Sequence, residues 1–129
     1  MRQLVMGARV ARLATVSPDG GPHLVPIVFA LADDRLVTGV DAKPKSGRRL
    51  ARFTNVAAHP AVSVLIDEYD DDWSRLWWVR LDGEAREESQ VRDRLLALLA
   101  DKYPQYRSQP PSGPFLVMEI SRWTGWSAV

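Results

Sequence analysis

The first 40 positions contain three short apolar runs, which are separated by residues that favour turns. The runs cover residues 8–16, 22–31 and 35–40, and the intervening sequences are Ser-Pro-Asp-Gly-Gly and Ala-Asp-Asp. Gly, Pro, Asp and Ser supply the backbone geometry and local hydrogen bonds that tight turns need. The pattern therefore predicts three antiparallel strands joined as a meander. Pro26, inside the second run, cannot donate a backbone hydrogen bond, which predicts a sheet edge, a bulge or a break there.

A segment with helical spacing follows the predicted meander. It covers residues 47–58 and is preceded by Ser46, whose hydroxyl can cap a helix. The apolar residues that we expect on the face toward the sheet recur at spacings of three and four: Leu50, Phe53 and Ala57. The next run, residues 61–66, is apolar and rich in β-branched side chains. It predicts a strand in the middle of the core that is buried on both faces.

The second half of the chain predicts further strands. Side chains alternate in character over residues 76–81, which predicts a strand with something to contact on each face. The dipeptide Asp82-Gly83 is typical of a hairpin turn, after which residues 84–88 continue the pairing. A last strand is predicted over residues 115–123. The total is six or seven strands.

A second helix is predicted over residues 90–102, with Ser89 as its N-cap. Its apolar face consists of Val91, Leu95, Leu98 and Leu99. Many short strands with sequence-adjacent pairing and few helices indicate a mainly β protein, either a small antiparallel barrel or a sandwich. We expect a single domain over residues 1–129.

Charge and composition exclude several function classes. Seventeen basic and sixteen acidic side chains leave a net charge of +1, too little for the broad positive field of a nucleic-acid-binding protein. The chain has no cysteine and only two histidines, His23 and His59, so we expect no thiol nucleophile and no metal site. The acidic residues 67–72 lack the spacing of a calcium loop and indicate a solvated turn. The apolar runs are too short to span a membrane, so we expect a cytoplasmic protein.

Four cations lie between the third apolar run and the first predicted helix. They are Lys43, Lys45, Arg48 and Arg49. The free N–H groups and the positive dipole end of a helix, combined with these charges, suit an anion such as a phosphate. A solvated basic loop is the alternative explanation of the same charges. Two of the chain's three lysines lie here among arginines, which favours the phosphate site.

All five tryptophans lie in the second half of the chain. Trp77 and Trp78 are adjacent, so in a strand they point to opposite faces, and at least one meets a second surface. That surface is either a partner subunit or a flat ligand. Ser17 lacks the Gly-x-Ser-x-Gly context of an esterase nucleophile, and catalytic residues stay unassigned.

Several segments, taken in order along nearly the whole chain, together resemble one family. They are residues 11–20, 23–29, 37–38, 43–50, 59–64, the Trp-Trp-Val-Arg strand and residues 122–126. In these segments the chain resembles the pyridoxamine-phosphate-oxidase-like proteins of the FMN-binding split β-barrel superfamily. The resemblance is to their actinobacterial, coenzyme F420-dependent branch in particular.

The resemblance implies a homodimer of six-stranded antiparallel split β-barrels with two or three helices, and flavin-like cofactors in grooves shared by the subunits. Basic residues after the third strand hold the phosphate end in this family, here Lys43, Lys45, Arg48 and Arg49. Residues of the second and third strands would lie along the ring system, here Val25, Pro26, Ile27, Thr38 and Val40. The partner subunit would close the groove with Trp77 or Trp78 and with Arg80.

The choice between FMN and F420 depends on the anionic tail. FMN ends in one phosphate, whereas F420 carries a phosphodiester and several glutamates, which need a longer basic track. Four cations over seven residues, with Arg52 a turn further on, suit the longer tail. Val28-Phe29 also stands where pyridoxamine-phosphate oxidases have a basic residue toward the phosphate, and this departure argues against FMN and against vitamin B6 chemistry.

The resemblance thus predicts an F420-dependent oxidoreductase. Reduced F420 would transfer a hydride to a small conjugated or quinone-like substrate, and the protein would bind, orient and exclude water without a side-chain nucleophile. Two alternatives remain open: an FMN-binding oxidoreductase of the same fold, and a non-catalytic carrier of F420.

Overall fold

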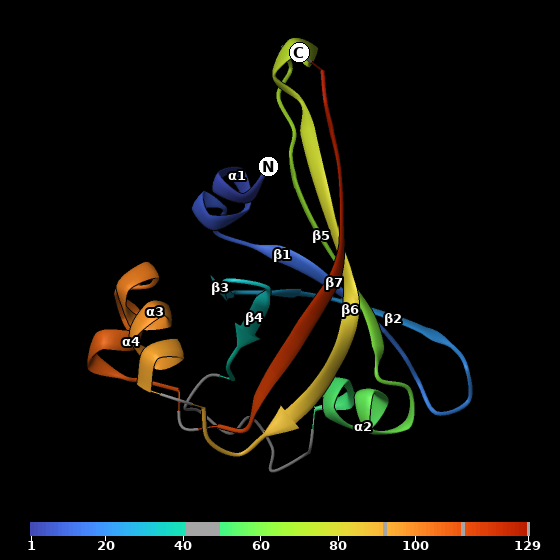
Figure 1. The fold of residues 1–129 in the computed structure, drawn as a ribbon, viewed down its shortest axis with the longest axis vertical. Coiled ribbons are helices and arrows are strands. Elements are labelled where there is room, and N and C mark those ends of the chain that lie inside the picture. The colour runs from blue at the N-terminus through green and yellow to red at the C-terminus, as the bar shows by residue number, and fades with distance from the viewer. Residues whose placement is uncertain (41–49, 92, 112, 129) are drawn as a thin grey trace.

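The computed structural model describes residues 1–40, 50–91, 93–111 and 113–128. Its strands form one antiparallel sheet in the order β2-β1-β5-β6-β7-β4-β3 (Figure 1). The strands are β1 (Ala11–Val16), β2 (Pro22–Ile27), β3 (Ala30–Ala32), β4 (Arg35–Thr38), β5 (Ala61–Glu68), β6 (Trp77–Glu88) and β7 (Phe115–Ser127). The mainly β class is confirmed, and the described residues form seven strands, where the resemblance implied six. In the described part of the chain, no helix is long and apolar enough to cross a bilayer.

The two edge strands of the sheet, β2 and β3, are connected only by Val28 and Phe29. This connection spans at most about 11 Å, so the sheet must curl until its two edges meet as a barrel. The run 22–31, predicted as one strand, is therefore two strands at opposite edges, and the predicted meander is interrupted between them. Pro26 lies on edge strand β2, where a missing N–H is tolerated.

A side-chain hydrogen bond marks the break at Phe29. Its backbone N–H donates to the hydroxyl of Tyr103 at 3.1 Å, and this hydroxyl donates to the carbonyl of Arg9 at 3.0 Å. The tyrosine thus satisfies a backbone donor that a continuing strand would have paired. The next residue, Ala30, starts the pairing with β4.

The helices are α1 (Arg2–Gly7), α2 (Ala51–Ala58), α3 (Asp93–Lys102) and α4 (Gln105–Ser108), with a 3₁₀ turn η1 (Trp73–Arg75). The two helices predicted from the sequence, α2 and α3, begin later in the structure than predicted, and α1 and α4 were not predicted. The N-cap of α2 is Leu50, and the predicted cap, Ser46, lies outside the described residues. Ser89 lies four residues before α3 and is not its cap.

The buried face of α2 differs from the predicted stripe. Phe53, Asn55 and Val56 are buried, whereas Leu50 and Ala57 are exposed. The buried apolar pair packs inside the barrel, and the Asn55 amide donates to the hydroxyl of buried Thr15 at 2.9 Å. This hydrogen bond satisfies the polar group that the helix carries into the core.

Two apolar clusters organise the fold. The larger one fills the barrel and includes Val5 of α1 and Phe53 of α2. These two helices lie at opposite ends of the barrel (Figure 1). The smaller one packs α3 and α4 against the outer side of β3, β4 and the start of β7. Its residues are Ala30, Val37, Val91, Leu95, Leu99, Tyr103, Tyr106, Phe115 and Val117. None of the described helices covers the outer side of β2, β1, β5 and β6.

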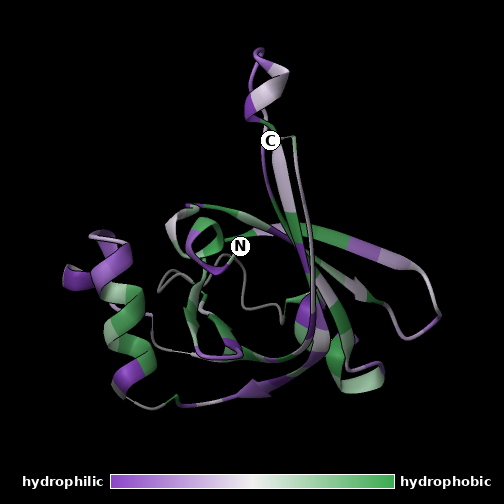
Figure 2. Ribbon diagram, turned by 45° about the horizontal axis from the view of Figure 1, so that its top comes forward, coloured by the Kyte–Doolittle hydropathy of each residue, from purple (hydrophilic) through white to green (hydrophobic). Residues whose placement is uncertain are grey.

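Strand β5 is central, as predicted, but only one of its faces is buried. Val62, Val64 and Ile66 point into the barrel, while the alternating Leu65 is 39% exposed. The strands of the barrel carry both hydrophobic and hydrophilic residues (Figure 2). The strand's apolar composition therefore reflects an outer face that is also partly apolar.

Gly83 lies inside the long strand β6 and not in a hairpin turn, which corrects the prediction for Asp82-Gly83. The β6–β7 register changes at this point, since Asp82 faces Arg122 but Gly83 faces Ile120. Ser121 is thus the extra residue of a β-bulge. Past the bulge, β5, β6 and β7 continue beyond the barrel as an arm with η1 at its tip (Figure 1).

Replacing Gly83 should destabilise the sheet. A Cβ added there would lie 2.0 Å from the carbonyl oxygen of Glu119, a backbone atom that cannot move aside. We expect Gly83→Ala to lower the free energy of unfolding by about 2–3 kcal/mol, measured by urea denaturation. Gly7→Ala is the control, because a Cβ at Gly7 meets no atom within 4 Å. Equal stability of the two variants would contradict the close approach.

The titration of Lys102 should make the free energy of unfolding depend on pH in the alkaline range. Its ammonium lies 3.6 Å from the ring centroid of Phe29. Burial, with a smaller repulsion from Arg9, lowers the pKa of Lys102 from 10.5 to about 8. The unfolded chain therefore holds more protons above pH 8, and the free energy of unfolding should rise from pH 8 toward pH 10.

The comparison is with Lys102→Met, measured by urea denaturation across the same pH range. The variant should lack this rise, so its stability relative to the wild type should fall as the pH increases. Parallel profiles for the two proteins would show that Lys102 titrates normally.

Candidate functional site

On the uncovered outer face of the sheet, side chains of neighbouring strands lie side by side in rows that cross the strands. Alternation along each strand and the strand register together define three rows of outward side chains. The first is Leu24, Ala14, Ser63, Asp82 and Arg122; the second is Pro26, Arg12, Leu65, Arg80 and Thr124; the third is Asp67, Trp78 and Trp126. Side chains from five strands therefore converge on one surface.

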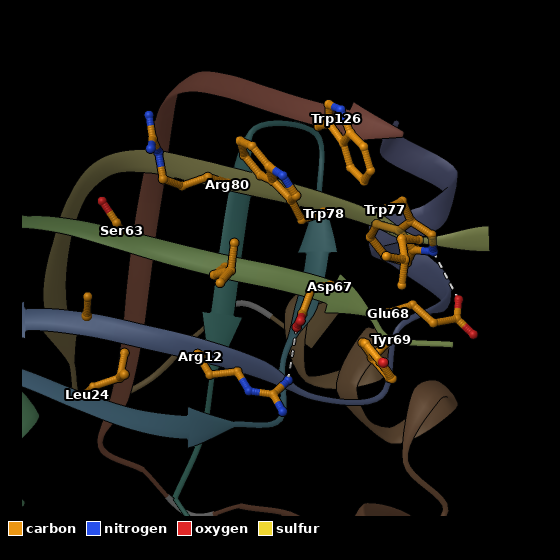
Figure 3. Close-up of a pocket in the computed structure, with 13 residues that line it drawn as sticks. Arg12, Leu24, Ser63, Asp67, Glu68, Tyr69, Trp77, Trp78, Arg80 and Trp126 are labelled. Carbon is orange, nitrogen blue, oxygen red and sulfur yellow. Dashed lines mark hydrogen bonds and ion pairs between the residues drawn. The ribbon is translucent and has the colours of Figure 1, made fainter. Parts of the chain in front are cut away.

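This surface forms a groove of about 740 Å³, which we call the aromatic groove (Figure 3). Its lining is mainly apolar, and Leu24, Leu65 and Trp126 are 67%, 39% and 49% exposed. Exposed apolar surface of this kind is typical of a ligand or subunit contact. The groove is lined by Arg12, Ala14, Leu24, Ser63, Leu65, Asp67, Glu68, Tyr69, Leu76, Trp77, Trp78, Arg80 and Trp126.

Ion pairs and hydrogen bonds fix the polar groups at the ends of the groove. Arg12 lies 3.5 Å from Asp67, and the indole N–H of Trp77 donates to Glu68 at 2.9 Å, at the foot of the arm. Figure 3 shows Arg12 reaching along the sheet to Asp67. At that end of the groove, Arg12 and Asp67 are therefore paired with each other, and Glu68 is held by the indole of Trp77.

Asp82 is the centre of the second polar group. The hydroxyl of Ser63 donates to its Oδ1 at 2.6 Å, and Nε of Arg80 donates to its Oδ2 at 3.1 Å. The Ser63 hydrogen bond, and then Arg80 and Arg122, lower the pKa of Asp82. The carboxylate is therefore ionised at neutral pH, and the Ser63–Asp82–Arg80 chain carries one positive and one negative charge.

A second hollow of about 800 Å³ continues the same face and shares Ala14 and Ser63 with the aromatic groove. Its acidic lining residues are Asp82, Glu84 and Glu119. The face is thus divided into an aromatic half and an acidic half.

Of the residues predicted for the site, the structure brings Trp77, Trp78 and Arg80 together in the aromatic groove. Trp78 and Arg80 lie on the outer face of β6, side by side in Figure 3. Trp77 points the other way, packs against the interior cluster and meets the groove at its edge.

The other predicted residues lie elsewhere. Ile27 and Thr38 are buried, and Val25 and Val40 pack against the barrel core; Pro26 is exposed on the outer face of β2. The predicted phosphate-end residues lie outside the described part of the chain: Lys43, Lys45, Arg48 and Arg49.

Residues of the groove that the sequence did not single out come from neighbouring strands. Ser63 and Leu65 stand at alternate positions of β5, so alternation places them on one face of that strand, and the strand register joins that face to β6. The assignment of Arg12 and Trp126 also requires the strand order, which one sequence does not provide.

A flat ring system fits the aromatic groove. Its volume lies in the range of small-molecule sites, and the Trp78 and Trp126 side chains offer aromatic surface from neighbouring strands. Arg80 adds hydrogen-bond donors suited to ring carbonyl groups. The ring part of a flavin-like cofactor is thus compatible with the described residues.

Comparison with solved structures gives the fold of the chain. A FAD-binding protein from Mesorhizobium loti matches with 24% identity and a TM-score of 0.69, over 96% of this chain and 89% of that one. An F420 reductase matches with 20% identity and a TM-score of 0.69, over 95% and 94%. A heme storage protein, HutZ from Vibrio cholerae, matches with 12% identity and a TM-score of 0.70, over 98% and 90%.

At these identities, the solved structures share the fold and differ in what they bind. A search of the curated proteins gave no significant match. The family model of pyridoxamine 5'-phosphate oxidase matches residues 1–127, almost the entire chain. The chain therefore belongs to the pyridoxamine 5'-phosphate oxidase family.

Proposed function

We propose that this protein is an oxidoreductase that binds the ring of coenzyme F420 in the aromatic groove. The observation that carries the proposal is the joint position of Trp78, Trp126 and Arg80 on one open face of the sheet. An oxidoreductase family and an F420 reductase of the same fold support it.

The side chains of the groove would bind and orient the ring. Trp78 and Trp126 provide aromatic contact, Leu65 extends the apolar floor between β1 and β6, and Arg80 donates hydrogen bonds. When bound, reduced F420 supplies a hydride for a small conjugated or quinone-like substrate. The protein then contributes position and exclusion of water, which need no side-chain nucleophile.

A second copy of the chain would cover the groove. The helices α3 and α4 pack on the other side of the barrel, so the outer face of β1, β5 and β6 is left apolar and open. A homodimer through this face would bury Leu24, Leu65 and Trp126 and exclude water from the ring.

The anionic tail of the cofactor would leave the groove away from the acidic half. Asp82 is paired with Arg80, and Glu119 with Arg35 and Arg86, so the described lining there offers no row of free cations to a polyanion. Glu84 adds a negative charge that would repel it. The proposed tail contacts are the four cations predicted from the sequence, Lys43, Lys45, Arg48 and Arg49.

The two alternatives use the same groove. FMN would place the same kind of ring there but has a single phosphate, and a carrier protein would bind F420 without turnover. The length of the basic segment, from Lys43 to Arg49, favours F420 over FMN.

Cofactor titration tests the proposal. We expect quenching of deazaflavin fluorescence at micromolar concentration and no retention of FMN. Trp78→Ala should weaken F420 binding about tenfold or more, as expected for removing an aromatic contact. Trp73→Ala is the matched control, because Trp73 is exposed at the tip of the arm and does not line the groove. Equal affinity of the two variants would place the ring elsewhere.

The tail assignment has its own test. Lys45→Ala combined with Arg49→Ala should weaken F420 binding at low salt and flatten its dependence on ionic strength, since two charge contacts are lost. The same pair of substitutions should leave the thermal unfolding midpoint unchanged. An unaltered salt dependence would remove these two residues from the tail site.

A third experiment distinguishes an enzyme from a carrier protein. Loss of reduced F420 absorbance only when substrate is added would exclude a carrier.

A further inference from the structure

On the outer face, hydrogen bonds link Ser63, Asp82 and Arg80 into one network, which holds the carboxylate of Asp82 from two sides. Asp82 stands two residues after Arg80 on β6, so both side chains leave the same face of the strand. Ser63 lies directly opposite Asp82 on β5. Both oxygens of the carboxylate are therefore used, one by a hydroxyl at 2.6 Å and one by a guanidinium nitrogen at 3.1 Å.

Among the residues that the structure describes, Asp82 holds the guanidinium of Arg80 by Nε alone. The two terminal nitrogens have no partner there. Because a guanidinium is planar, a fixed Nε also fixes the direction of the remaining N–H groups.

The carboxylate of Asp82 lies where it can hold the guanidinium of Arg80 in one orientation, and we call this contact the brace. The side chain of Asp82 is 28% exposed, against 44% for Arg80, so it lies deeper in the sheet than the group it holds. It also stands at the border of the two halves of the face, since Asp82 lines the acidic hollow and Arg80 lines the aromatic groove. The brace thus orients the guanidinium from the side away from the aromatic residues.

We propose that Asp82 and Ser63 are positioning residues, which direct the free N–H groups of Arg80 toward the carbonyl-rich edge of the bound ring. A flavin-type ring gains electron density on its carbonyl groups and nitrogens when it is reduced, and a fixed cation at that edge favours this form. The brace should make the groove bind the reduced cofactor more tightly than the oxidised one. This inference rests on the proposed function of the same groove.

Affinities for the two redox states provide the test. Oxidised and reduced F420 are titrated separately, the latter without oxygen, and the ratio of their dissociation constants is compared among variants. Arg80→Ala should lower the preference for the reduced form about tenfold, the effect of one charge-assisted hydrogen bond. Asp82→Asn should cause most of the same loss, although it removes a negative charge from the face. Ser63→Ala should cause a smaller loss, and Ser63→Thr should restore it.

A double variant separates positioning from an independent role. If Asp82 acts through Arg80, adding Asp82→Asn to Arg80→Ala should change the ratio no further. Additive effects, or an unchanged or increased preference for the reduced form in Asp82→Asn alone, would overturn the inference. A purely structural brace would lower the unfolding midpoint and leave the ratio as in the wild type, which also contradicts it.

Failure of the proposed function gives a different result. If the wild type binds neither redox state, or if Trp78→Ala binds as the wild type does, both the groove assignment and this inference fall. If the wild type binds and Trp78→Ala weakens binding while Asp82→Asn does not alter the ratio, only the positioning role falls.

Discussion

The structure depends on one covalent constraint, the two-residue connection between β2 and β3. These strands are the opposite edges of a seven-stranded sheet, yet only Val28 and Phe29 lie between them. The short connection closes the sheet into a barrel and gives every inward residue a common core. The buried apolar side chains, such as Val62, Val64 and Ile66 of β5, mark which side of the sheet faces in. The position of the aromatic groove follows, because α3 and α4 cover the other side.

One side of the barrel is covered by helices and the other is open, and the two sides differ in how their apolar side chains are buried. Covering β3, β4 and the start of β7 with α3 and α4 buries a second apolar cluster around Leu99 and Tyr103. The same treatment of β1, β5 and β6 would leave no room for a ligand. Their outer face instead carries apolar side chains such as Leu65 beside charges that are paired within the face. Such a surface is poorly satisfied by water alone, which agrees with the cofactor site and the second subunit proposed for it.

Much of the fold could be predicted from alternation and turn chemistry. The edge position of Pro26, the central place of β5 and the apolar face of α3 follow from local pattern. The break at Phe29 could not, since it depends on Tyr103, which is 74 residues further along the chain. The buried face of α2 could not be predicted either, because the hydrogen bond from Asn55 to Thr15 depends on how the helix packs against the barrel.

The candidate site shows the same limit. Trp78 was singled out because it adjoins Trp77 in a predicted strand, and Arg80 because of the family resemblance. Ser63 and Arg12 join them only through the order and register of neighbouring strands. The bulge at Ser121 adds one more long-range effect. Leu116, Met118 and Ile120 face the barrel interior, and by simple alternation Trp126 would do so as well. The inserted residue reverses the parity of β7, so Trp123 packs inward and Trp126 turns outward beside Trp78. A single residue of insertion thus decides which of two indole rings belongs to the core and which is available to a ligand.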